Sequence, residues 1–134
     1  MEAINLIKSI NEIQDIVNFI DSIIGQHKIK FILLEGEIGS GKTTLVRQLS
    51  KIWNNDQAVL SPSFNKMLVY DQFIHLDAYN MSDEDLEQFY DYFEEKFILI
   101  EWSNLLNYQF DQFIKIKIRF KDENHRFYNI TWKE

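Results

Sequence analysis

Apolar residues near the start of the chain recur every three or four positions, which is the spacing of one helix face. Asn11 is a favourable N-cap residue before them, and Glu12 adds negative charge to the first turn. Gly25 follows the last of these apolar positions and is typical of a helix end. We therefore predict an amphipathic helix over residues 12–24, preceded by a short edge strand at residues 3–8.

Residues 29–34, which are apolar except for Lys30, and the continuous apolar run 97–100 are typical of strands buried on both faces. Apolar positions return to helical spacing over residues 42–53, which predicts a second helix. Further strands are predicted at residues 58–60, 67–70, 73–79, 114–120 and 127–132, and a short acidic helix is predicted to begin at Asp83.

Strands that alternate with helices predict one α/β domain over residues 1–134. Its central sheet should be mostly parallel, with helices on both faces, and should end in a C-terminal antiparallel hairpin. The first strand of that hairpin alternates isoleucine with Lys115, Lys117 and Arg119. We interpret those three side chains as a solvated strand face.

Composition excludes several classes of protein. No cysteine is present, which rules out disulfides, thiolate metal sites and a cysteine nucleophile. A net charge of -7 argues against nucleic-acid binding as the main activity. The apolar runs are far shorter than the about 20 residues of a membrane span, and no signal peptide is visible. We expect a cytoplasmic protein that does not enter a membrane.

Residues 36–43 read Gly-Glu-Ile-Gly-Ser-Gly-Lys-Thr and match the phosphate-binding pattern G-x-x-x-x-G-K-[ST] at every fixed position. Glycines let the backbone N–H groups of such a loop turn toward phosphate oxygens. Lys42 would place its charge on the β- and γ-phosphates, and the Thr43 hydroxyl would coordinate Mg²⁺. The preceding apolar strand and the following helix are the expected context, so we predict a three-layer P-loop NTPase-like fold.

A P-loop site also needs a carboxylate that holds the Mg²⁺ shell or positions water. Glu101 ends an apolar strand, and Asp77 lies near the end of another, so both should emerge beside the loop. His75 shares a strand face with Asp77 and is interpreted either as a partner of Asp77 or as a structural residue. A zinc site is disfavoured because no further ligand lies at suitable spacing.

Two other features remain open on residues alone. Residues 61–64, Ser-Pro-Ser-Phe, are either a segment that senses the γ-phosphate or a proline bend on the surface. Trp102, directly after Glu101, is either a core residue or an aromatic side chain at the mouth of the site.

The order of these motifs resembles the TsaE family of P-loop ATPases, which act in bacterial tRNA threonylcarbamoyladenosine biosynthesis. The family's G-[DE]-[LI]-G-[AS]-G-K-T-T corresponds to residues 36–44, and its S-P-T-[FY] to residues 61–64. Its H-x-D-x-Y-R corresponds to residues 75–80, and its strand ending in E-W to Glu101 and Trp102. The resemblance covers nearly the whole chain.

The resemblance implies slow hydrolysis of ATP with Mg²⁺, in support of two partners of the TsaB and TsaD type. These partners transfer a threonylcarbamoyl group to adenosine 37 of tRNAs reading codons that begin with A. The chain would contact tRNA only indirectly and be a monomer when alone. By matched position the catalytic residues would be Glu101, Asp77 and Lys42, and the metal ligands Thr43, Asp77 and Glu101. The nucleotide would contact Asn11, Glu12, Gly36, Glu37, Ile38, Gly39, Ser40, Gly41, Lys42, Thr43, Thr44, Ser63 and a hairpin residue, His125 or Arg126, of which we favour Arg126.

Two departures from the family pattern bear on function. Ser63 replaces threonine and keeps a hydroxyl, whereas Asn80 replaces arginine and removes a charge. A small P-loop metabolite kinase is an alternative, although this chain has only three arginines and no cluster typical of a kinase lid. A non-hydrolytic module that uses ATP as a conformational switch is another.

Overall fold

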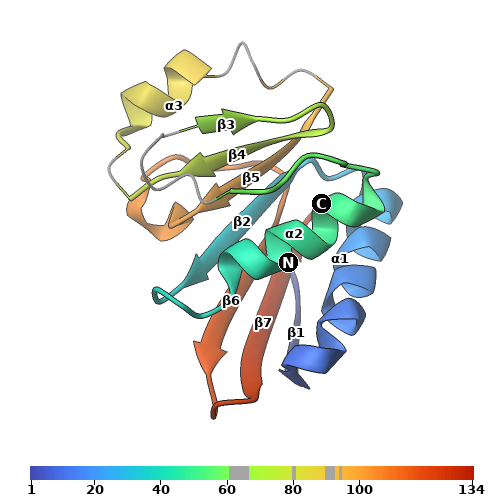
Figure 1. The fold of residues 1–134 in the computed structure, drawn as a ribbon. Coiled ribbons are helices and arrows are strands. Elements are labelled where there is room, and N and C mark those ends of the chain that lie inside the picture. The colour runs from blue at the N-terminus through green and yellow to red at the C-terminus, as the bar shows by residue number, and fades with distance from the viewer. Residues whose placement is uncertain (61–66, 80, 90–92, 94) are drawn as a thin grey trace.

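A computed structural model describes residues 1–60, 67–79, 81–89, 93 and 95–134. Among them it places one seven-stranded sheet of order β1-β7-β6-β2-β5-β4-β3 (Figure 1). The strands are β1 (Glu2–Ser9), β2 (Phe31–Gly36), β3 (Met67–Val69), β4 (Phe73–Asp77), β5 (Phe97–Glu101), β6 (Phe113–Phe120) and β7 (His125–Lys133). The helices are α1 (Ile13–His27), α2 (Lys42–Ile52) and α3 (Asp83–Phe89), with short 3-10 turns at Ile10–Glu12 and Ser103–Leu105.

The centre of the sheet is parallel, as predicted. Strand β2 pairs in parallel with β5 and with β6, and β5 pairs in parallel with β4. Strands β6 and β7 form the predicted antiparallel hairpin, and β1 is an edge strand against β7. The parallel strands therefore bring their carboxyl ends to one edge of the sheet, where α/β proteins bind ligands.

Both faces of the sheet carry an apolar core, so the fold has three layers. On one face α1 and α2 pack against β6, β2 and β5, and the inner stripe of α1 is fully covered (Figure 1). On the other face the single buried side chain of α3, Leu86, joins side chains of β4 and β5. Together with the parallel centre and the hairpin, this confirms the predicted α/β fold with helices on both faces.

Three local predictions were wrong. Helix α1 does not stop before Gly25 but continues to His27, and Lys28 closes it with a left-handed backbone of φ 56°. Asn11 lies within the first 3-10 turn, while Glu12 holds the N-cap position. Residues 58–60 form no strand, because side chains take their hydrogen bonds: Arg47 Nε donates to the carbonyl of Val59, and Leu60 N–H donates to the Tyr70 hydroxyl.

The hairpin strand β6 alternates as predicted. Ile114, Ile116 and Ile118 are buried against the helices, and Lys117 and Arg119 on the other face are exposed. Lys115 is partly covered. None of the helices in the described part of the chain is long and apolar enough to cross a bilayer.

Candidate functional site

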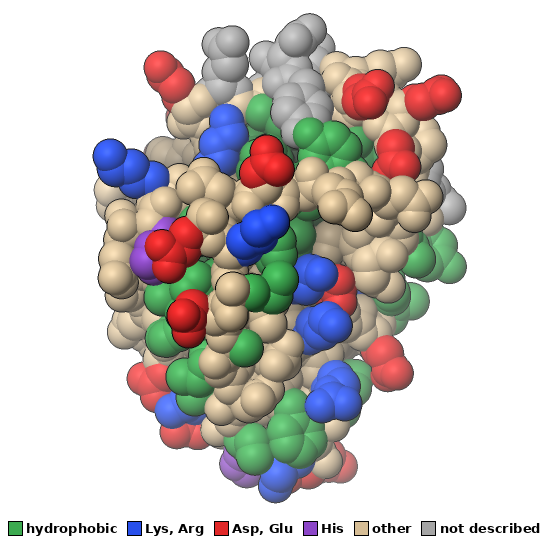
Figure 2. Space-filling model, turned by 180° about the vertical axis from the view of Figure 1, so that it is seen from behind, with side chains coloured by type: hydrophobic (Ala, Val, Ile, Leu, Met, Phe, Trp, Pro, Cys, Tyr) green, Lys and Arg blue, Asp and Glu red, His purple; other side chains and the backbone are tan. Residues whose placement is uncertain are grey.

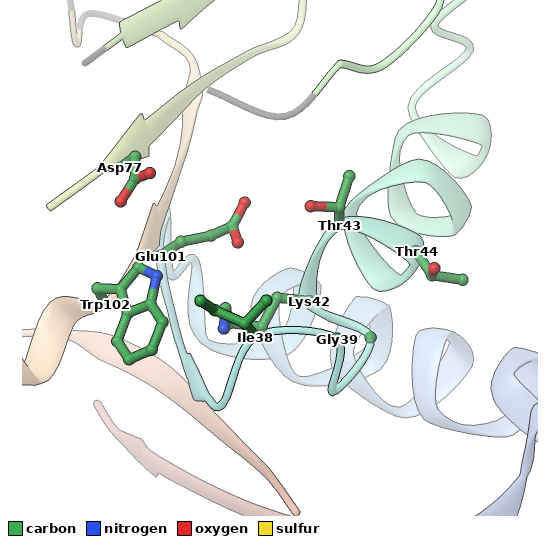
Figure 3. Close-up of a pocket in the computed structure, with 9 residues that line it drawn as sticks. Ile38, Gly39, Lys42, Thr43, Thr44, Asp77, Glu101 and Trp102 are labelled. Atoms are coloured by element: carbon green, nitrogen blue, oxygen red, sulfur yellow. The ribbon is translucent and has the colours of Figure 1, made fainter. Parts of the chain in front are cut away.

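A cavity of about 240 Å³ lies where β2, β4 and β5 end (Figure 3). Its lining joins the loop after β2, the start of α2 and the ends of β4 and β5. The residues that line it are Ile38, Gly39, Gly41, Lys42, Thr43, Thr44, Asp77, Glu101 and Trp102. The structure thus brings the predicted phosphate loop and both predicted carboxylates to one cavity, although the two carboxylates lie 24 positions apart in the sequence.

Gly36 and Gly41 illustrate why the loop at residues 36–41 needs glycine. A Cβ on Gly36 would lie 2.8 Å from the carbonyl oxygen of Ile118 on β6, which is closer than a real Cβ tolerates. Gly41 adopts φ 113° at the N-cap of α2, a backbone conformation that favours glycine. Helix α2 therefore begins at Lys42 with its positive end at the cavity, which is the arrangement that binds phosphate groups.

Lys42 is the cation of the cavity. Its ammonium donates hydrogen bonds to the carbonyl oxygens of Gly36 and Glu37 and lies 4.2 Å from the centre of the Trp102 ring. Burial lowers the pKa of Lys42, and the charges of Glu101 and Asp77 oppose that shift. The loop carbonyls and the ring hold the ammonium beside the phosphate loop, where an anion would meet it.

Glu101 is buried at the end of β5, and one of its carboxylate oxygens contacts the imidazole of His75. The Nε2 atom of His75 lies 2.5 Å from Oε2 of Glu101, without the alignment of a hydrogen bond. His75 is fully buried and does not line the cavity, so it reaches the cavity only through this carboxylate. The contact favours a partnership of His75 with Glu101 over one with Asp77.

Asp77 and Trp102 frame the opposite side of the cavity from α2 (Figure 3). Asp77 lies opposite Glu101 in the pairing of β4 with β5, and its Oδ1 accepts a hydrogen bond from the backbone N–H of Tyr79 at 2.9 Å. Trp102 has φ 61°, and its backbone N–H donates a hydrogen bond to the carbonyl of Leu34. This left-handed turn aims the indole at the cavity, so Trp102 lies at the site rather than deep in the core.

The oxygen atoms in the cavity suit a magnesium ion. Figure 3 shows the Thr43 hydroxyl and the Glu101 carboxylate facing one another, with Asp77 nearby, whereas Thr44 points away. Within the described residues no three His, Cys, Asp or Glu side chains form a metal cluster. Mg²⁺ prefers oxygen ligands and is usually held by one or two carboxylates together with phosphates and waters, so the donor set fits this ion.

Other predicted contact residues lie outside the cavity lining. Asn11 and Glu12 form part of the first 3-10 turn, and a Glu12 carboxylate oxygen accepts the N–H of Ser9 at 2.9 Å. Arg126 does not line the cavity but contacts the phosphate loop, since its Nε donates a hydrogen bond to the carbonyl of Ser40 at 3.3 Å. Ser40 itself is buried. His125 is hydrogen-bonded to Asp122 in the hairpin turn. Ser63, with the rest of residues 61–64, and Asn80 lie outside the described residues.

The phosphate loop between a buried strand and a helix, the parallel sheet and the cavity at its carboxyl edge define a P-loop NTPase-like α/β protein. A family model described as "Threonylcarbamoyl adenosine biosynthesis protein TsaE" matches residues 7–128. The chain therefore belongs to the TsaE family, which takes part in the biosynthesis of tRNA threonylcarbamoyladenosine.

Individual relatives agree with this assignment. The "tRNA threonylcarbamoyladenosine biosynthesis protein TsaE" of Nostoc sp. is 32% identical over 111 residues, which cover 75% of this chain and 68% of that protein. The protein of the same name from Aquifex aeolicus is 36% identical over 78 residues, covering 54% of this chain and 56% of the relative. The solved structure "Crystal structure of Bacillus subtilus YdiB" superposes with a TM-score of 0.70 at 19% identity, over 99% of this chain and 87% of that one. At that identity the superposition shows the fold.

Proposed function

We propose that this chain is a Mg²⁺-dependent ATP-binding subunit with slow ATPase activity. In this proposal it serves the threonylcarbamoylation of adenosine 37 in tRNAs reading ANN codons, in the cytoplasm, together with partners of the TsaB and TsaD type. The observation that carries the proposal is the cavity that joins Lys42, Thr43, Asp77 and Glu101 in a member of the TsaE family.

The loop and Lys42 would bind the triphosphate. Backbone N–H groups at the start of α2 would meet phosphate oxygens, and the Lys42 ammonium would exchange its carbonyl partners for the β- and γ-phosphates. Thr43, Asp77 and Glu101 would hold Mg²⁺, which would neutralise negative charge on the phosphate groups. The ring of Trp102 shields the ammonium from water on one side.

Glu101 is the residue best placed to orient an attacking water. Its carboxylate lines the cavity, and burial together with the His75 contact leaves the side chain little room to move. A preorganised group of this kind positions water without reorganisation during the reaction. Asp77, on the neighbouring strand, would serve mainly the metal.

Two substitutions test binding and turnover separately. Lys42→Ala should sharply weaken Mg·ATP binding in calorimetric titration while the fold persists, because the charge in the loop is lost. Lys51→Ala is a matched control, since Lys51 is exposed at the far end of α2. Glu101→Gln should keep nucleotide binding and reduce hydrolysis at least about a hundredfold. Unchanged ATP affinity in Lys42→Ala would overturn the assignment of the site.

The pathway role needs its own assay. Purified chain, the two partner proteins, tRNA and the threonylcarbamoyl donor should give modified tRNA, with Lys42→Ala and Glu101→Gln both reducing product. ATP turnover that ignores the partners would count against a complex-dependent role. Tight ATP binding with no turnover at all would favour the non-hydrolytic switch, and phosphate transfer to an added metabolite would favour the kinase.

A further inference from the structure

The sheet face opposite α1 and α2 is only partly covered. Its outward positions on β6 carry Phe113, Lys115, Lys117 and Arg119, while the alternate isoleucines are buried on the helical side. Figure 2 looks at this face and shows lysine and arginine side chains in a column beside hydrophobic ones. A cationic face is unexpected in a protein of net charge -7.

A hollow of about 510 Å³ lies on this face, between β6 and the segment that follows β5. We call it the β6 groove. It is about twice the volume of the cavity at the phosphate loop. Its lining comprises Met1, Leu33, Glu35, Ser103, Asn104, Leu106, Tyr108, Gln109, Phe110, Phe113, Lys115, Lys117 and Lys133.

The charges of the β6 groove are unbalanced. The Lys115 ammonium lies 3.5 Å from one oxygen of Glu35, and the Lys117 ammonium lies 3.8 Å from the other. Lys133 lies opposite Phe113 in the pairing of β6 with β7 and adds a third ammonium to the lining. Three lysines and one carboxylate line the groove, which gives its side chains a net charge of +2.

The groove also offers apolar and unpaired polar contacts. Phe110 and Phe113 line it with aromatic surface. The Oγ of Ser103 is buried and has no hydrogen-bond partner among the described residues, although buried hydroxyls normally have one. A ligand in this groove would thus meet cations, aromatic rings and an unsatisfied hydroxyl together.

Residues of the groove are direct sequence neighbours of residues at the nucleotide cavity. Glu35, which holds two of its lysines, is the residue before Gly36 of the phosphate loop. Ser103 follows Trp102 and stands two positions after Glu101. Strand β2 and the segment that follows β5 therefore line the groove, so an occupant would contact residues adjacent to the nucleotide cavity in sequence.

We propose that the β6 groove docks an acidic segment of a partner protein, with carboxylates on Lys115, Lys117 and Lys133 and an apolar side chain against Phe110 and Phe113. A polypeptide is favoured over RNA by charge and by size. Proteins that bind nucleic acid commonly make roughly six or more phosphate contacts, whereas this groove has three lysines, two of them already sharing Glu35. The net charge of -7 also repels a long polyanion. This inference rests on the proposed function in one respect, namely that the chain acts together with a protein partner.

The test is fluorescence anisotropy with a labelled peptide that contains four glutamates around one phenylalanine, measured over a salt series. The control peptide carries glutamine in place of glutamate. The double variant Lys115→Glu/Lys117→Glu should weaken binding of the acidic peptide at least about tenfold, since repulsion replaces two charge contacts. Lys51→Glu, on α2, makes the same kind of charge change away from the groove and should bind like the parent.

Two further arms identify the binding place and the ligand class. Amide shifts in an NMR titration should fall on residues 103–117. The phosphate loop is a second site that could attract an acidic peptide, so Lys42→Ala is included; it should bind the peptide as well as the parent does. The double variant should keep parental Mg·ATP affinity, so failure here is distinguishable from failure of the proposed function. No peptide binding by the parent, equal binding by the double variant, or tighter and salt-steep binding of a tRNA anticodon stem-loop would each overturn the proposal.

Discussion

Replacing His75 by leucine tests the contact behind the nucleotide cavity. The substitution leaves the buried Glu101 carboxylate without the imidazole that lies 2.5 Å from it. Leaving a buried carboxylate without its neighbouring polar group costs about 3–5 kcal/mol. The same change removes Nδ1 of His75, a buried nitrogen with no hydrogen-bond partner among the described residues. Because a buried polar atom without a partner destabilises the fold, its removal should stabilise the variant by about 1 kcal/mol. The expected net loss of unfolding free energy is about 2–4 kcal/mol.

The variant should still fold. A domain of 134 residues has an unfolding free energy of about 7–20 kcal/mol at the usual value per residue. At about 4 °C per kcal/mol for a domain of this size, the expected fall in melting temperature is about 8–16 °C. Hydrolysis should fall more than Mg·ATP affinity, because the altered residue acts through Glu101 and does not line the cavity.

Urea unfolding followed by circular dichroism measures the loss of unfolding free energy, and a double-mutant cycle shows how much of it comes from the contact of His75 with Glu101. His75→Leu combined with Glu101→Gln should lose less than the sum of the single variants, by about 0.5–3 kcal/mol. His125→Leu is the control, since His125 is a half-exposed hairpin residue, and its unfolding midpoint should stay close to the parent's. A loss below about 1 kcal/mol in His75→Leu, or strict additivity in the cycle, would refute the reasoning.

Two other predictions follow from the site and its loop. Asp77→Asn should raise the Mg²⁺ concentration that half-saturates hydrolysis about tenfold or more, because one of two cavity carboxylates is lost; an unchanged Mg²⁺ titration would contradict this. Gly36→Ala should destabilise the fold by about 1–3 kcal/mol in urea unfolding, because its Cβ would press on the Ile118 carbonyl. Gly25→Ala is its control, since Gly25 lies within α1 with open space around it, and should stabilise the fold by up to about 1 kcal/mol.

Features that depend on neighbouring residues in the sequence were predictable. The phosphate loop is contiguous, and the chemistry of phosphate binding dictates its spacing. The position of Glu101 and Asp77 beside it followed from one topological rule, because parallel strands end at the same edge of a sheet. The structure places all three elements around one cavity, while the catalytic and metal-binding roles of their residues stay predictions.

Features that depend on strand order were not predictable. The contact of His75 with Glu101 requires that β4 lie beside β5, which no local pattern encodes. Arg126 meets the carbonyl of Ser40 across 86 positions of sequence, which the alternation of β7 does not reveal. The end of α1 was misjudged because the tertiary burial of Ile23 and Ile24 carries the helix through Gly25, and propensity is a weak guide where packing opposes it.

The place of β1 in the sheet has a consequence for synthesis of the chain. Among the described residues β1 pairs with β7 alone, so Asn5 finds its hydrogen-bond partner Asn129 after 124 further residues have been made. On the ribosome, β1 emerges before β7 and cannot pair until β7 has been made, so its backbone groups are open to other strands meanwhile. Pairing across such a long stretch of sequence is slow, because the intervening chain loses conformational entropy before any stabilising contact forms. Strand β1 is therefore the strand of this sheet that waits longest for its partner during translation, which exposes it to misassociation.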